Sequence, residues 1–194
     1  MAKRFNSRQK GNNTELKVAK ILTEAWKSKF VRTPNSGAFK GLAPSDIIPE
    51  SNADWMGLPY FLEIKNRVGW TLEHLISSKC QSAVLAWYLE EEKKQVEARG
   101  LKHYDKCMLL IFTKNHDDLY VMYRNEGVGV GWLPRYTKSP ESALTFTQLT
   151  NDGTEITEYR ILTLKDFLQC TDFQADKANY SKWLADKNKK GEVK

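Results

Sequence analysis

Cysteine is scarce in this sequence, whose 194 residues contain only Cys80, Cys107 and Cys170. Their odd number and wide spacing match neither a disulfide framework nor a zinc site. We therefore expect them to pack as small apolar side chains in a reducing compartment, which favours a cytoplasmic location.

Long apolar runs are also missing. No stretch approaches the roughly 20 apolar residues that a membrane-spanning helix needs, and the basic N-terminal residues lack the apolar core of a secretion signal. Repeats and low-complexity segments do not stand out either. Because a chain of 194 residues can bury a full core, we expect one domain with appendages.

Positive charge is present in excess but is unevenly distributed. The net charge is +6, yet residues 1–40 hold ten Lys and Arg against two Glu, a balance of +8, while the remaining 154 residues have a balance of −2. Such asymmetry indicates a surface for a polyanion, because phosphate contacts dominate nucleic-acid affinity. Lys10, Arg32 and Lys40 flank the motifs described next, and they are candidates for these contacts.

The most informative motif is Asp46 followed by Glu63-Ile64-Lys65. We expect residues 44–48 and 60–65 to form two short strands joined as an antiparallel hairpin, with its loop near residues 52–56. In that register Asp46 lies about opposite Glu63. Side chains alternate between the faces of a strand, so Glu63 and Lys65 share one face.

Two carboxylates that face each other across a ladder repel unless a positive group lies between them. A divalent cation is the simplest such group, and carboxylate oxygens suit Mg²⁺. The ammonium of Lys65 can then steady an attacking water or the charge that develops on a phosphate. This spacing is typical of a metal-dependent phosphodiesterase; an ordinary half-exposed hairpin with three charges on its wet face is the alternative.

An amphipathic helix is expected from residue 12 to about residue 29. Glu15 opens its apolar stripe, which continues through Val18, Leu22 and Trp26. A carboxylate on the buried side needs a partner, which a metal site would supply. Alternatively, Asn12 and Glu15 have the spacing of a capping box, in which Glu15 would only cap the helix.

In their order along the chain, these segments resemble the motifs of a PD-(D/E)XK nuclease. They are similar in particular to those of the archaeal-type Holliday junction resolvases and their phage-encoded relatives. The segments are Gly11 with Glu15, residues 32–37, residues 46–48 and residues 63–67. Two departures are that Ser45 separates Pro44 from Asp46, and that Ala38 stands where a second glycine would be usual.

The resemblance implies an α/β, restriction-endonuclease-like fold with a mixed central sheet flanked by helices. Residues 1–124 would form the nuclease core with a basic N-terminal segment, and residues 125–194 would add strands, a short helix and a lysine-rich tail to the same domain. The implied catalytic residues are Glu15, Asp46, Glu63 and Lys65. Mg²⁺, for which Mn²⁺ substitutes, would be held by Asp46, Glu63 and the Ile64 carbonyl, with Glu15 bound directly or through water.

The implied activity is hydrolysis of DNA phosphodiester bonds, with four-way (Holliday) junctions as the substrate in recombination or phage DNA processing. A junction resolvase cuts two symmetry-related strands, so a homodimer is expected. The DNA contacts would come from Lys10, Arg32, Ser36, Lys40 and Arg67. Another PD-(D/E)XK DNase, of nicking, repair or restriction type, remains an alternative, as does a non-catalytic DNA-binding protein.

The rest of the chain is expected to supply scaffold. Trp70 either joins the core or stacks on a base. Residues 71–76 and 82–99 should be helices; in the second, apolar side chains face the sheet and the run 90–94 is a solvated face. The apolar side chains are Val84, Leu85, Trp87, Tyr88 and Leu89. Further strands are expected at residues 107–112, 119–123, 143–149 and 158–162, with a short helix from residue 163 and a fraying tail from residue 176.

Overall fold

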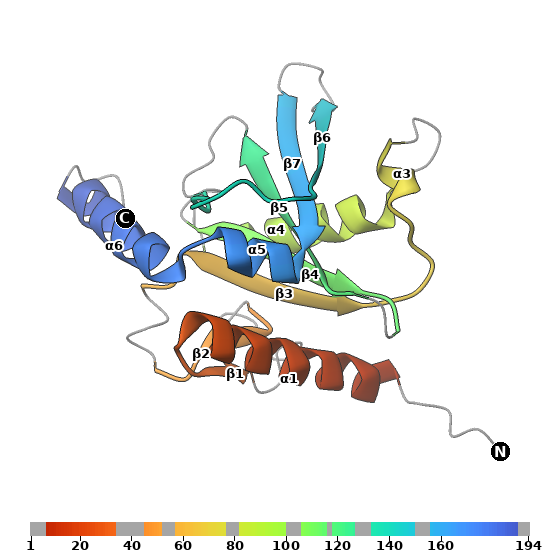
Figure 1. Ribbon diagram of the computed structural model, residues 1–194, viewed down its shortest axis with the longest axis horizontal. Helices are drawn as coiled ribbons and strands as arrows, with labels where there is room; N and C mark the ends of the chain where they lie inside the picture. The colour runs from red at the N-terminus through yellow and green to blue at the C-terminus, as the bar shows by residue number, and fades with distance from the viewer. Residues whose placement is uncertain are drawn as a thin grey trace.

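A five-stranded mixed sheet forms the centre of the computed structural model, in the order β3-β4-β5-β7-β6 (Figure 1). The strands are β3 (Tyr60–Asn66), β4 (Cys107–Thr113), β5 (Tyr120–Glu126), β6 (Leu144–Leu149) and β7 (Ile156–Thr163). β3 and β4 are parallel, and the other pairs are antiparallel. The structure describes residues 7–33, 45–51, 57–76, 82–99, 106–115, 118–126, 133–149 and 156–189.

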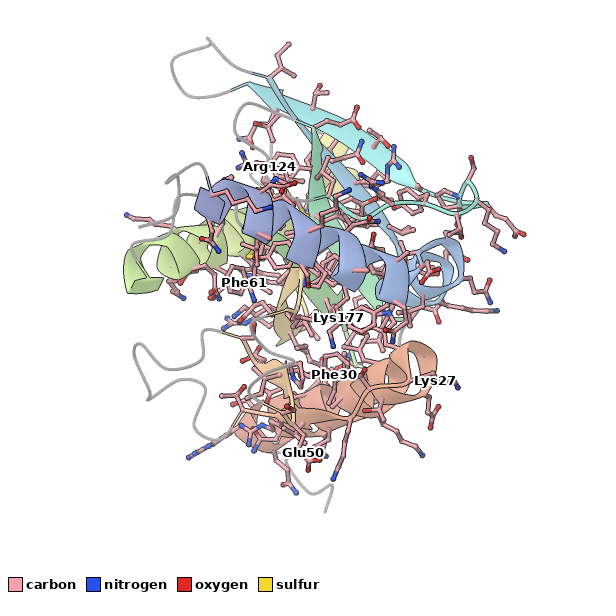
Figure 2. All side chains as sticks on the ribbon, turned by 90° about the vertical axis from the view of Figure 1, so that its left-hand side faces the viewer. Lys27, Phe30, Glu50, Phe61, Arg124 and Lys177 are labelled. Atoms are coloured by element: carbon pink, nitrogen blue, oxygen red, sulfur yellow. The ribbon has the colours of Figure 1, made fainter. Side chains whose placement is uncertain are left out.

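Helices cover both faces of this sheet. α1 (Ser7–Trp26), α5 (Leu164–Cys170) and α6 (Phe173–Lys189) pack with one core cluster, and α4 (Ala83–Arg99) packs with the other. Figure 1 shows α1 and α4 separated by the sheet, and Figure 2 shows the same separation from the side. The short helix α3 (Glu73–Ile76) precedes α4. The expected fold class is confirmed: the chain has an α/β, restriction-endonuclease-like core.

Strand periodicity decides which residues of β3 meet which helix. Tyr60, Leu62 and Ile64 belong to the cluster with α1, whereas Phe61 belongs to the cluster with α4. Glu63 shares the face of Phe61, as the sequence predicted. The active-site candidates of β3 therefore lie on the α4 side of the sheet.

The predicted hairpin between residues 44–48 and 60–65 was wrong. β2 (Ile47–Pro49) pairs instead with β1 (Phe30–Arg32) in a separate two-stranded antiparallel sheet. β3 pairs in parallel with β4, and every residue of β4 is buried. Because β4 has buried residues on both of its faces, it fits a parallel pair of strands that helices cover on both sides. A two-stranded hairpin would leave one face exposed to solvent.

The first helix begins earlier than predicted. α1 starts at Ser7, so Glu15 lies in the helix interior, more than two turns from the N-terminus. The capping-box alternative for Glu15 was therefore wrong, because a cap must lie in the first turn. The predicted stripe is correct: Val18, Leu22 and Trp26 are buried. The helix ends where Lys27 adopts a positive φ of 54°.

The C-terminal segment is ordered helix rather than a fraying tail as far as Lys189. Asp176 is fully buried and accepts a hydrogen bond from the Tyr60 hydroxyl of β3. Phe173 stacks on Trp26 of α1, with ring centroids 4.3 Å apart. These contacts anchor α6 to the core. Composition alone suggested fraying because the exposed residues of α6 are largely charged.

Two cysteines behave as the sequence predicted. Cys107 and Cys170 are buried free thiols, and burial raises the pKa of the Cys107 thiol. Cys80 lies outside the described residues. Among the helices within the described ranges, none combines the length and apolarity that crossing a membrane requires.

Candidate active site

The residues before β2 bring Asp46 alongside β3, even though the two strands form no ladder. The Asp46 backbone N–H donates to the Leu62 carbonyl at 2.9 Å, and the Ile64 N–H donates to Asp46 Oδ2, also at 2.9 Å. Ser45 Oγ accepts from the Leu62 N–H at 3.2 Å. Asp46 and Glu63 are thus neighbours, as the sequence predicted, but through one backbone and one side-chain hydrogen bond between Asp46 and β3 rather than a hairpin register.

Thr33, directly after β1, fixes this segment from the other side. Its N–H donates to the Asp46 carbonyl at 2.9 Å, and its hydroxyl donates to the Ser45 carbonyl at 2.7 Å. Both Thr33 and Ser45 are buried. Asp46 is therefore held by hydrogen bonds on both sides, which pre-positions its carboxylate beside β3.

Glu63 is a buried carboxyl group with a strongly perturbed pKa. The side chain lies under α4, and the residue is only 7% exposed. Burial, reinforced by the negative charge of Asp46, raises the pKa of Glu63 from 4.5 to about 8, although Lys65 acts in the opposite direction. A carboxyl group whose ionised form is this disfavoured, beside a second carboxylate, is typical of a functional site.

Lys65 neutralises part of this negative charge. Its Nζ donates to Glu63 Oε1 at 2.5 Å and to Glu91 Oε1 at 2.9 Å. Burial alone would lower the pKa of Lys65, but Glu63 and Glu91 outweigh burial and raise it. The ammonium of Lys65 therefore keeps its charge at neutral pH.

Glu91 is a residue of this site that the sequence analysis missed. It was assigned to a solvated run, but the structure buries it, and its neighbour Glu92 pairs with Arg124 of β5 at 2.7 Å. The signal was present in the sequence, because Val84, Tyr88 and Glu91 follow helical spacing on one face of α4. By the same periodicity Leu89 points away from the sheet and is 37% exposed, contrary to expectation.

Glu15 has a protein partner rather than a helix cap. It is nearly buried on α1, and Arg32 of β1 donates its Nε–H to Glu15 Oε2. The structure therefore brings together two residues that the sequence had placed in one site. Ligation of a metal by Glu15 remains a prediction.

The remaining basic candidates gather at the carboxyl end of β3. Lys10 of α1 donates to Asn115 Oδ1 at 2.6 Å, and the Arg67 backbone N–H donates to the Thr113 carbonyl at 3.1 Å. Asn66 ties α1 to this end of the sheet, because its Nδ2 donates to Thr14 Oγ1 at 2.7 Å. Ser36 and Lys40 lie outside the described residues.

Trp70 belongs to the core and not to the exposed surface. It is buried, makes an edge contact with Phe112 and donates its Nε1–H to the Arg67 carbonyl at 2.9 Å. The base-stacking alternative for Trp70 was therefore wrong. Arg67 itself is exposed, with its guanidinium 5.9 Å from the ring centroid of Trp87.

The donor chemistry of the site suits a divalent cation. In the part of the chain that the structure describes, no three His, Cys, Asp or Glu side chains gather closely enough to hold a metal. Asp46 and Glu63 nevertheless supply two hard oxygen donors. Burial and then the charge of Asp46 raise the Glu63 pKa, and a bound cation would offset both effects because it stabilises the ionised carboxylates. The Ile64 carbonyl as a third donor remains a prediction.

The fold and the site together define a PD-(D/E)XK nuclease. A mixed sheet between helices carries Glu63 and Lys65 on one strand, with Asp46 held beside it. Residues 6–175 match the model of a family described as "Phage putative PDDEXK endonuclease", and the chain belongs to this family. The suspected resemblance to PD-(D/E)XK nucleases with phage relatives is thereby confirmed; nucleases of this type generally use divalent metal ions. Searches of curated proteins and of solved structures found no match.

Proposed function

We propose that this nuclease hydrolyses DNA phosphodiester bonds with Mg²⁺ held by Asp46, Glu63 and the Ile64 carbonyl. The observation that supports this most strongly is the pair formed by the buried Glu63 and the partly buried Asp46, in which desolvation and then the charge of Asp46 raise the pKa of Glu63 to about 8. When bound, the metal polarises the phosphate and lowers the pKa of a bound water. Mn²⁺ is expected to substitute for Mg²⁺.

Lys65 then acts on the phosphate or on the attacking water. Its ammonium carries three donors, and the one not engaged by Glu63 and Glu91 can reach a phosphate oxygen. Arg32, oriented by Glu15, is proposed to contact the phosphate from the α1 side. Lys10 and Arg67, together with Ser36 and Lys40, are proposed to contact the DNA backbone.

The proposed substrate is a four-way DNA junction cut by a homodimer. The order of the motifs, which is that of the archaeal-type resolvases, and the +8 balance of residues 1–40 support this choice. Each chain carries one set of Asp46, Glu63 and Lys65, so cutting two symmetry-related strands within one complex requires two chains.

The experiment that tests substrate class is incubation of purified protein with a four-way junction, a nicked duplex, a linear duplex and single strands. Each is tested with Mg²⁺, with Mn²⁺ and with EDTA, beside Glu63→Gln as an inactive control. Symmetric cleavage of the junction alone, lost in EDTA, is the expected result. Nicked duplex products instead point to a nicking or repair DNase, and double-strand breaks in linear duplex point to a restriction-type enzyme.

Light scattering tests the proposed assembly independently of cleavage. A dimer at micromolar concentration is expected. A protein that is monomeric both alone and on junction DNA contradicts the resolvase assignment and favours a nicking nuclease, whose catalytic residues would be the same.

A further inference from the structure

Helix α4 places a third carboxylate in the site, opposite the strand that carries the catalytic motif. Glu91 Oε1 lies 2.9 Å from Lys65 Nζ, and the two side chains are 9% and 17% exposed. Lys94, one helical turn further along α4, also reaches Glu91 Oε1 at 2.9 Å but is half exposed. Glu91 is thus the buried link between α4 and the catalytic lysine.

Packing alone does not account for an acid at this position. Glu91 continues the buried stripe of Val84 and Tyr88, where an apolar side chain would satisfy the same face of α4. Burying a carboxylate is costly unless a cation pairs with it, and replacing a buried ion pair by apolar residues is often neutral or stabilising. The residue that Glu91 pairs with inside the protein is Lys65, so a role connected with Lys65 explains its presence.

We infer that Glu91 is a positioning residue that holds the Lys65 ammonium in place during the reaction. This inference rests on the proposed function. In the structure Lys65 is shared between Glu63 and Glu91. A cation bound by Glu63 would compete with Lys65 for the same carboxylate, and this would weaken the contact between Glu63 and the Lys65 ammonium. Glu91 keeps its hold on the ammonium, because it is fixed to a helix and takes no part in the proposed metal ligation.

A merely structural ion pair is the competing explanation, and the chain offers a matched control for it. Glu92 is the next residue of α4 and is 12% exposed at its side chain, close to the 9% of Glu91. It pairs with Arg124 of β5 at 2.7 Å, again joining α4 to the sheet. Glu92→Gln therefore removes a comparable buried charge without touching Lys65.

The test compares Glu91→Gln with Glu92→Gln on the DNA that the wild-type protein cleaves. Glu91→Gln is expected to lower kcat by tenfold or more, on the order of what misplacing a catalytic group costs, with KM changed less than about twofold. Glu92→Gln is expected to keep kcat within about twofold while lowering Tm as much as Glu91→Gln does. Glu91→Asp, which keeps the charge, should recover part of the loss and serves as the second variant if Glu91→Gln does not fold.

A second measurement uses the metal-free protein and needs no cleavage. The ammonium resonance of Lys65, assigned by its disappearance in Lys65→Arg, is observed by lysine-selective NMR. The contacts with Glu63 and Glu91 should slow exchange of this ammonium with water in the wild type and in Glu92→Gln, whereas Glu91→Gln should broaden or abolish the resonance.

Several results overturn the inference. They are an unchanged kcat in Glu91→Gln, an equal loss in Glu92→Gln, a rise in KM alone, or an unaltered Lys65 resonance. Failure of the proposed function looks different: the wild-type protein then cuts no DNA with any divalent metal, while the resonance still reports whether Glu91 holds Lys65.

Discussion

Neutralising Glu63 is expected to stabilise the metal-free protein while abolishing its activity. The pKa of Glu63 is about 8 in the folded protein and 4.5 in the reference state, because the group is buried and faces Asp46. Between these two values the folded protein binds more protons than the unfolded chain. The free energy of unfolding therefore falls as the pH rises from about 4.5 to about 8.

The magnitude follows from the size of the shift. One unit of pKa corresponds to about 1.4 kcal/mol, so the Glu63 shift is equivalent to about 4–5 kcal/mol. Glu63→Gln mimics the protonated acid and does not titrate, so it lacks this loss of stability. The variant and the wild type should be about equally stable near pH 4.5, and at pH 8 the variant should be more stable by about 4 kcal/mol.

The assay is urea unfolding in EDTA at several pH values between 4.5 and 8.5, followed by the fluorescence of the buried residues Trp26 and Trp70. Glu50→Gln is the control, because Glu50 is about half exposed and pairs with Lys29 on the surface. Mg²⁺ added at pH 8 should restabilise the wild type but not Glu63→Gln. Parallel pH profiles for the wild type and Glu63→Gln would refute the reasoning, since Glu63 would then have an ordinary pKa.

Three further predictions concern other parts of the molecule. Asp46→Asn should abolish cleavage but keep or improve DNA binding in a gel-shift assay, and parallel loss of binding and cutting would indicate a structural role. It should also make the pH dependence of stability shallower, because the Asp46 charge contributes to the raised Glu63 pKa. In a fluorescence-anisotropy titration, Lys10→Glu and Arg67→Glu should each weaken binding to all DNA sequences alike and reduce its salt dependence, since phosphate contacts carry no sequence information. A loss of affinity that differs among DNA sequences would contradict this. Asp176→Ala should cost about 2–3 kcal/mol in chemical unfolding, because it leaves the buried Tyr60 hydroxyl without its acceptor; a change below about 0.5 kcal/mol would mean that α6 does not depend on this bond.

Local periodicity accounts for the parts of the site that could be predicted. Alternation along residues 60–66 places Glu63 and Lys65 on one face of a strand, whatever that strand pairs with. Asp46 was expected opposite Glu63 from the register of a hairpin that does not form. The structure obtains this proximity in another way, through the Ile64 N–H and the Asp46 carboxylate.

Partners that come from distant segments could not be predicted in this way. Lys65 meets Glu91 because α4 packs on one face of the five-stranded sheet, and Glu15 meets Arg32 because α1 packs against β1. The charged run containing Glu91 looked solvated because composition does not reveal which side of a helix is covered.

By itself, the sequence determined the acid–lysine pair on one strand and the buried stripe of α1, because each depends on the spacing of near neighbours. The class of fold followed from the resemblance of the motifs to those of a nuclease family. Only the tertiary structure decided that β3 pairs in parallel with β4, that Asp176 anchors the C-terminal helix, and that Glu91 contacts Lys65. The physical reason is that the cost of burying a charge depends on its partner, and these partners are chosen by packing between segments far apart in the chain.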